Sequence, residues 1–194
     1  MELIGKMEHG PARRFGDAEV YLFLSLLKEG GKISRRGAAE YLGLGEGSVR
    51  KIADIAKKAG LIHVFQTGIR MSDYGDEFLS GLPLRMVNME PIDSVVGSSQ
   101  QAVLVKGMSY KITNGMMQRD AGIRAGSSGC TTFVIRNGRM TVPPDWDADR
   151  ESPELSELIR NVSGMAEDDV LIIGGDDDPP KARTAALTAA LELL

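Results

Sequence analysis

The sequence predicts an α+β protein with two domains, residues 1–82 and 83–194. Residues 45–62 repeat apolar side chains at the spacing of an amphipathic helix, and two short apolar runs around a glycine-containing turn follow them. After Gly81-Leu82-Pro83 the pattern changes to apolar runs that alternate with helical segments. We therefore place the domain boundary at this break, where few contacts are expected to cross.

The first domain is predicted to contain four helices and one hairpin. The helices cover residues 17–30, 33–44, 45–60 and 72–82, and the hairpin pairs residues 61–65 with 69–71. Asp17, Ser34 and Ser72 are of the residue types that cap helix N-termini. A glycine-rich turn, residues 43–47, separates the second helix from the third. This order of elements indicates a winged helix-turn-helix domain.

The second domain is predicted to alternate strands and helices. Its strands cover residues 102–106, 130–136, 139–142 and 170–173, and its helices cover residues 112–124, 152–162 and 179–194. Asn137-Gly138 supplies the two positive φ angles of a type I′ turn, so the second and third strands should form a hairpin. The order strand, helix, hairpin, helix, strand, helix favours a ferredoxin-like α/β sandwich with one added helix.

Composition restricts the function. The chain of 194 residues is 42% hydrophobic, which is enough for a packed core, and carries a net charge of −4. Positive charge is local: between Lys28 and Lys58 eight basic and four acidic residues give +4. A single cysteine, Cys130, excludes an internal disulfide, and with two histidines it cannot form a Cys/His zinc site. No apolar run approaches the roughly 20 residues that span a bilayer, and residues 1–16 lack a secretory signal, so we expect a cytoplasmic protein without a membrane partner.

The third helix is the first candidate site. Its apolar stripe is predicted to comprise Val49, Ile52, Ile55, Ala56 and Ala59, which leaves a basic face outward. Basic residues on such a face can bind phosphates or base edges, although a charge run is often only a solvated surface. Asp54 lies on the same face and opposes binding. The candidate DNA-binding residues are Arg35, Arg36, Ser48, Arg50, Lys51, Lys57, Lys58 and Arg70.

The second candidate site is the segment of residues 119–132 in the second domain. Its glycines and serines offer backbone N–H groups and hydroxyls, and two arginines precede them, as in sites that bind anions. The alternative interpretation is a flexible turn between a helix and a strand, with an Arg–Asp pair. The candidate ligand-binding residues are Arg119, Asp120, Arg124, Ser127, Ser128 and Thr131.

Two further features have a simpler interpretation than a catalytic one. Residues 176–178 are three aspartates that could hold a hard cation, but an acidic helix N-terminus is favoured. Cys130 has no neighbouring histidine in the sequence and begins an apolar strand, which favours a buried, inert thiol. We therefore predict no metal, no cofactor and no catalytic residue.

Residues 34–62 (SRRGAAEYLGLGEGSVRKIADIAKKAGLI), followed by IRMSDYGDEFL, resemble the winged-helix module of archaeal and bacterial transcriptional regulators. In such modules residues 48–58 form the recognition helix. The segments QRDAGIRAGSSGCTTFVIRNGRMTVPPD and VLIIGGDDDPPKARTAALTAALELL resemble archaeal proteins in which this module is fused to a conserved C-terminal domain of unknown function. The resemblance implies a regulator with a sensor or dimerisation domain.

The function expected from the sequence is therefore that of a homodimeric transcriptional regulator rather than an enzyme. Its partners would be double-stranded DNA and a small anionic effector, which shifts the population between two dimer geometries. The alternative is an enzyme whose active site combines the 119–132 segment with Asp176, Asp177 and Asp178. A third possibility is a protein-interaction module, since a winged helix can also bind proteins through the same face.

Overall fold

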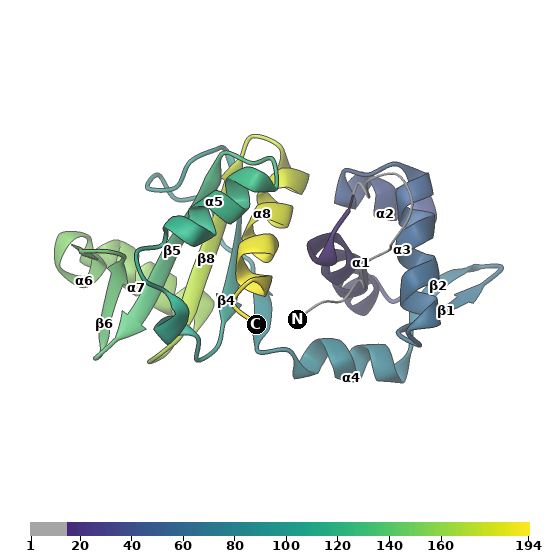
Figure 1. Ribbon diagram of the computed structural model, residues 1–194, viewed down its shortest axis with the longest axis horizontal. Helices are drawn as coiled ribbons and strands as arrows, with labels where there is room; N and C mark the ends of the chain where they lie inside the picture. Colours follow the sequence, from purple (N-terminus) through teal and green to yellow (C-terminus); the bar gives the residue numbers. More distant parts are fainter. Residues whose placement is uncertain (1–14) are drawn as a thin grey trace. The chain divides into compact units, whose positions relative to one another are not determined.

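The computed structural model describes residues 15–194, so the first 14 residues of the first predicted domain lie outside it. The chain divides into two compact units at the peptide between Leu82 and Pro83. The first unit is mainly helical, and the second is built on an antiparallel sheet (Figure 1). The protein is therefore a mixed α+β protein.

Within residues 15–82 the first unit contains four helices and a two-stranded sheet. In chain order these are α1 (Asp17–Gly30), α2 (Arg35–Leu42), α3 (Glu46–Lys58), β1 (Ile62–Phe65), β2 (Gly68–Met71) and α4 (Asp73–Gly81). Ser34 and Ser72 cap α2 and α4, because their hydroxyls accept hydrogen bonds from Gly37 and Gly75 at 3.1 and 2.9 Å. An isolated bridge joins Ile33, just before α2, to Ile69 in β2.

The apolar stripe of α3 anchors it in the first unit. Val49, Ile52 and Ala56 are fully buried, as predicted, and Ala53 joins them. Ala59 was predicted to belong to this stripe, but it is exposed, because the helix ends at Lys58 and Ala59 lies at its C-cap. The sequence of α4 predicts that Tyr74 points inward with Phe78 and Leu79, but Tyr74 is 59% exposed.

The second unit contains six strands in one antiparallel sheet. Its elements are β3 (Leu84–Val87), β4 (Ser99–Val105), α5 (Met116–Arg124), β5 (Gly129–Arg136), β6 (Arg139–Val142), β7 (Trp146–Asp147), α6 (Ala148–Glu151), α7 (Pro153–Ser163), β8 (Val170–Asp176) and α8 (Pro179–Leu191), with a short 3₁₀ turn at Ser109–Lys111. The strand order is β3-β4-β8-β5-β6-β7, so β3 and β7 are the edges.

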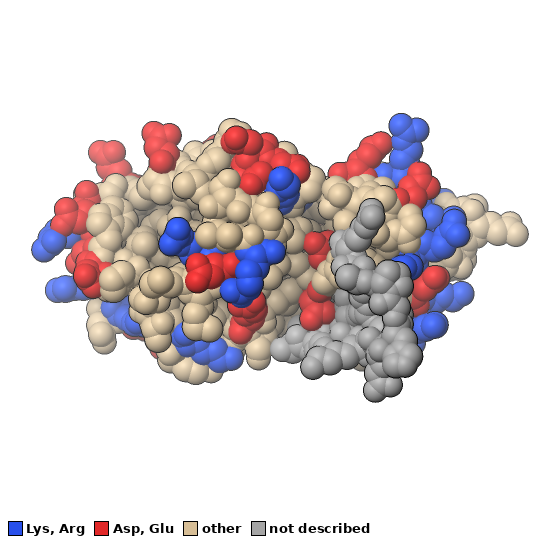
Figure 2. All heavy atoms as spheres, turned by 45° about the horizontal axis from the view of Figure 1, so that its top comes forward, with Lys and Arg blue, Asp and Glu red and all other residues tan. Residues whose placement is uncertain are grey.

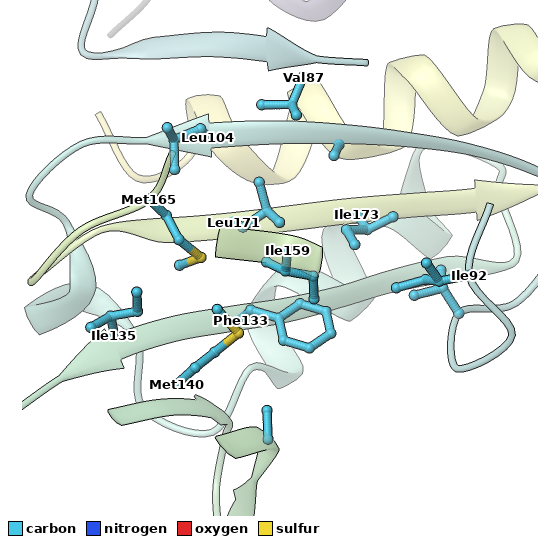
Figure 3. Packing of buried hydrophobic residues seen from close by; sticks show 13 residues of the cluster. Val87, Ile92, Leu104, Phe133, Ile135, Met140, Ile159, Met165, Leu171 and Ile173 are labelled. Carbon is cyan, nitrogen blue, oxygen red and sulfur yellow. The ribbon is translucent and has the colours of Figure 1, made fainter. Parts of the chain in front are cut away.

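Both faces of this sheet are covered. Gly174 in β8 faces α8, since a Cβ at this position would lie 2.5 Å from the Ala182 carbonyl oxygen of that helix. On the same face α5 packs on β5, where Gly122 approaches the Cys130 sulfur. On the other face Phe133 and Leu171 form one core cluster with residues from α6, α7 and the 88–98 segment (Figure 3); its members include Val87, Ile92, Leu104, Ile135, Met140, Ala148, Ile159, Met165 and Ile173.

The hairpin turn has the predicted geometry, whereas several boundaries differ from the prediction. Asn137 and Gly138 have φ angles of 52° and 75°, and Arg136 pairs with Arg139 across the turn. β8 continues through Gly174 and Gly175 to Asp176, beyond the predicted end at residue 173. Helix α5 begins at Met116 rather than at residue 112. The edge strands β3 and β7 and the short helix α6 were not predicted.

Among residues 15–194, no helix combines the length and the apolar character that crossing a membrane requires.

Candidate functional site

Four basic side chains surround one carboxylate on the outer face of α3. Asp54 is preceded by Arg50 and Lys51 and followed by Lys57 and Lys58, at the three- and four-residue spacings that make neighbours on a helix. All five residues are exposed, and none forms an ion pair within the part of the chain that the structure describes. The face therefore carries three net positive charges that are not neutralised by contacts within that part of the chain.

The remaining candidate DNA-binding residues lie around the β1–β2 hairpin and the start of α2 and α3. Arg35, at the first position of α2, lines a groove of about 320 Å³ between the hairpin and these helix N-termini, together with Glu46 and Gln66. Arg70 is exposed in β2, opposite His63 in β1. Figure 2 shows basic side chains beside the hairpin tip on the right, with acidic side chains among them.

Two members of the predicted set differ from the others. Arg36 forms an ion pair with Glu40 at 3.1 Å along α2, so its charge is partly balanced. Ser48 is only half-buried and lies in the first turn of α3, where its N–H donates to the carbonyl of Gly45. The structure therefore brings together Arg50, Lys51, Lys57 and Lys58 on one helix face and leaves Arg36 paired on α2.

In the second unit the serine loop, residues 125–128 between α5 and β5, binds a carboxylate of the same chain. The N–H and the hydroxyl of Ser128 both donate to Asp176 Oδ2, at 3.0 and 3.2 Å, and Asp176 Oδ1 accepts a third hydrogen bond from the N–H of Asp178 at 2.9 Å. Ser127 donates to the Gly122 carbonyl at 2.9 Å. The two serines that the sequence assigned to an external anion thus donate to groups of the same chain.

The six candidate ligand-binding residues do not converge. Arg124 forms an ion pair at 2.9 Å with Glu192, the C-cap of α8, whereas Arg119 and Asp120 are exposed and form no ion pair with a described residue. Arg119 and Thr131 line a cleft of about 170 Å³ at the start of α5, apart from the Ser128–Asp176 contact. Thr132 also lines this cleft, and its hydroxyl has no hydrogen-bond partner among the described residues. It was not among the sequence candidates, because the pattern of a strand does not show which of its hydroxyls lack a partner.

The aspartates at the end of β8, residues 176–178, form hydrogen bonds with two neighbouring loops. Asp177 Oδ1 accepts hydrogen bonds from the N–H and hydroxyl of Ser98, at 3.0 and 3.1 Å, while Asp176 holds Ser128. Among residues 15–194, no three His, Cys, Asp or Glu side chains are grouped to hold a metal ion.

Cys130 is a half-buried thiol in β5. Burial raises the pKa of Cys130 to about 12, so the thiol is protonated at neutral pH and is a poor nucleophile.

Residues 96–193, just over half of the chain, match the family described as a domain of unknown function, DUF4443. The chain belongs to this family. The DUF4443 match begins before β4 and ends near the C-terminus of α8, so it contains the serine loop, the cleft and Cys130 but not the basic face of α3.

The fold of this DUF4443 protein also occurs in a solved structure. The hypothetical protein PH0730 from Pyrococcus horikoshii OT3 is 24% identical, with a TM-score of 0.71, and the similarity covers 93% of each chain. At this identity the similarity establishes the fold alone. No curated protein matches the chain.

Proposed function

We propose that the protein is a DNA-binding transcriptional regulator whose first unit is a winged helix and whose second unit senses an effector or mediates dimerisation. The observation that carries the proposal is the set of unneutralised cations on α3, a helix with one buried apolar stripe. Four exposed cations on one helix face supply the positive charge that binds the phosphates of duplex DNA.

The arrangement around α3 supports the winged-helix assignment. Helices α2 and α3 are joined by a short turn in which Gly43 has a left-handed φ of 65°, and the β1–β2 hairpin follows α3 directly. The bridge between Ile33 and Ile69 adds a third extended segment to that hairpin, as expected of a wing. The same features agree with the resemblance to archaeal winged-helix regulators, in which α3 would be the recognition helix.

For the second unit, the ferredoxin-like assignment has partial support. β4 and β5 flank β8, and β6 and β8 flank β5, so each strand–helix–strand unit encloses an intervening strand. This is the split β-α-β arrangement of ferredoxin-like folds. However, α7 and α8 cover opposite faces, unlike the single helical layer of a simple two-layer sandwich.

A homodimer in the cytoplasm remains part of the proposal. From the sequence, the surplus apolar positions of the first helix and the edge of the 131–142 hairpin are the two surfaces that could form it. The apolar side chains Tyr21, Leu22 and Phe23 of α1 are less than 5% exposed, so they are buried within one chain. The β5–β6 hairpin is not a free edge either, because β6 pairs with β7. The edge strand β3 is the better candidate, since its outer backbone groups can pair with a second copy. Sedimentation at micromolar concentration should give a dimer; a strictly monomeric species would contradict it.

The DNA proposal is tested by fluorescence anisotropy with a labelled duplex at several salt concentrations. Replacing Arg50 and Lys57 with alanine should weaken binding and reduce the slope of log K against log salt by about 0.9 for each lost phosphate contact. A matched control replaces Arg139 and Lys181, two exposed cations of the second unit, and should bind as the parent does. Equal affinity and slope for the α3 variant and the parent would exclude this helix face from the interface.

A further inference from the structure

A small cleft lies where α5 begins, beside strand β5 and the end of β6. Its volume is about 170 Å³, and Gly115, Arg119, Thr132 and Val142 are among its lining residues. At roughly 30 Å³ for each water molecule, it has room for about five waters or one small organic molecule. The cleft is separate from the Ser128–Asp176 contact.

The N-terminus of α5 leaves hydrogen-bond donors without acceptors at this cleft. Gly115 is the N-cap and provides no side-chain cap, and the first turn contains no acidic residue. Asn114 accepts the Met116 N–H at 3.1 Å, but the N–H groups of Met117 and Gln118 have no acceptor among the described residues. The free N–H groups and the helix dipole favour a negative group here.

A buried hydroxyl provides an independent indication of a ligand. Thr132 is 3% exposed, and its Oγ1 has no hydrogen-bond partner among the described residues. Its side chain points toward the start of α5, because a Cβ on Gly115 would lie 3.8 Å from the Thr132 Cβ. Buried hydroxyls are nearly always paired, since an unpaired one loses its hydrogen bonds to water without a replacement.

The side chain of Gln118 adds a second unpaired polar group nearby. Gln118 is 4% exposed, on the buried side of α5 with Ala121 and Gly122, and its amide forms no hydrogen bond with a described residue. The amide atoms of Gln118 keep some contact with solvent, so among the described residues around the cleft the fully enclosed polar atom without a partner is Thr132 Oγ1.

The charged residues at the cleft favour a negatively charged ligand. Arg119 is exposed and has no ion-pair partner in the described part of the chain, and no carboxylate lines the cleft. Cys130 also lines it, but the thiol is neutral because burial raises its pKa to about 12, so it does not repel an anion. A guanidinium, two free N–H groups and a hydroxyl are donors suited to the oxygens of one anion.

We propose that this cleft binds a small oxyanion, a carboxylate or a phosphate, held by Arg119, the N-terminus of α5 and the Thr132 hydroxyl. Met116 and Val142 line the cleft as well and would contact a short apolar body attached to that anion. The role of the cleft as an effector site rests on the proposed regulatory function. Binding of an anion in the cleft does not depend on that function, and its test contains no DNA. The anion-binding proposal and the DNA-binding proposal can therefore fail separately.

The test titrates the full chain with sodium propionate, sodium phosphate or neutral propionamide at constant ionic strength, and follows Tm and calorimetric heat. We expect a saturable rise in Tm with propionate, with phosphate or with both, and none with propionamide. A response to one anion identifies the chemical class of the ligand. No saturable response to either anion, or an equal response to propionamide, would overturn the proposal.

Two variants assign the response to the cleft. Arg119→Gln should weaken binding about tenfold or more, whereas the control Arg139→Gln, at another exposed arginine, should bind like the parent. Thr132→Val, which replaces the unpaired hydroxyl with a methyl group, should leave the ligand-free Tm unchanged or higher and weaken binding. Unchanged anion affinity in Arg119→Gln would overturn the proposal even if Thr132→Val failed to fold.

Discussion

Asp176, at the end of β8, accepts hydrogen bonds from both the backbone N–H and the hydroxyl of Ser128, at 3.0 and 3.2 Å. A hydrogen bond from the N–H of Asp178 lowers the pKa of Asp176 most, and those from Ser128 lower it further, although burial opposes them. The carboxylate thus fixes the loop between α5 and β5 by the same chemistry that an external anion would use. This contact predicts how the loop responds to acid.

Protonation of Asp176 should release the Ser128 loop. Because the folded state lowers the Asp176 pKa below its ordinary value of 3.8, the contribution to stability is complete above about pH 4 and is lost as pH falls through the lowered value. The Ser128 amide resonance should therefore titrate in NMR spectra at acidic pH. In Asp176→Asn that titration should disappear and Ser128 amide exchange should be faster. A Ser128 resonance that ignores pH in the parent would contradict the prediction.

Asp149 should stabilise the junction of β6, α6 and α7. Its carboxylate accepts hydrogen bonds from the Met140 N–H at 2.8 Å, from the Ser156 hydroxyl and from Arg160 at 3.1 Å. Asp149→Ala leaves these donors without that acceptor and should lower the free energy of unfolding by about 1–3 kcal/mol. Asp145→Ala, an exposed neighbour without a described partner, is the control and should change it little.

The effect of Asp149→Ala should depend on pH. Burial raises the Asp149 pKa, but the hydrogen bonds from Ser156, Met140 and Arg160 outweigh it, and the net pKa lies below the ordinary 3.8. The stabilisation is therefore present above about pH 4 and lost as pH falls through the lowered pKa. Urea unfolding at neutral pH and near pH 2 should show a difference between variant and parent only at neutral pH; an equal difference at both would assign the loss to packing.

Local patterns in the sequence were sufficient to predict most of the helices and the central strands. The Asn137-Gly138 turn and the Ser34 and Ser72 caps depend on residues close in the chain, and the structure has all three. β3 was missed because four residues with Arg85 among them resemble a connector, and its pairing with β4 depends on tertiary contacts. The end of β8 was missed because Gly174-Gly175 suggests a loop, whereas here the glycines let other segments approach the strand.

The candidate sites were harder to predict than the fold, because they depend on contacts between residues that are far apart in the sequence. Helical spacing alone placed Arg50, Lys51, Lys57 and Lys58 on one face of α3. The partners of Ser128 and Arg124 lie 48 and 68 residues away in the sequence, so no local pattern could identify them. The unpaired Thr132 hydroxyl is visible only once the neighbours of β5 are known.

Asp54 should weaken any binding of DNA by the basic face of α3. Its carboxylate lies at the centre of four exposed cations and would face the phosphates. Asp54→Asn should strengthen duplex binding by about two- to fivefold at low salt, as expected for an exposed charge contributing about 0.5–1 kcal/mol. Glu77→Gln, an exposed acidic residue of α4, removes the same charge and should have a smaller effect in anisotropy titrations. If Asp54→Asn and Glu77→Gln were equal, only net charge would matter.

Gly174 should be necessary for α8 to pack on the sheet. A Cβ at this position would lie 2.5 Å from the Ala182 carbonyl oxygen and 2.6 Å from the Ala186 backbone nitrogen, and backbone atoms of a packed helix cannot move aside independently. Gly174→Ala should therefore lower the free energy of unfolding by about 3 kcal/mol, the upper end for overpacking, as measured by urea denaturation.

Two further variants separate this clash from other effects of replacing glycine. Gly81→Ala, in α4, meets no atom within 4 Å and should keep or slightly raise stability, because alanine favours the helical backbone. Adding Ala186→Gly to Gly174→Ala removes the side chain that lies 3.1 Å from the new methyl group but leaves the Ala182 oxygen in place, so it should not restore stability. Recovery in that double variant would show that the side chain of Ala186, rather than the backbone of α8, sets the spacing between β8 and α8.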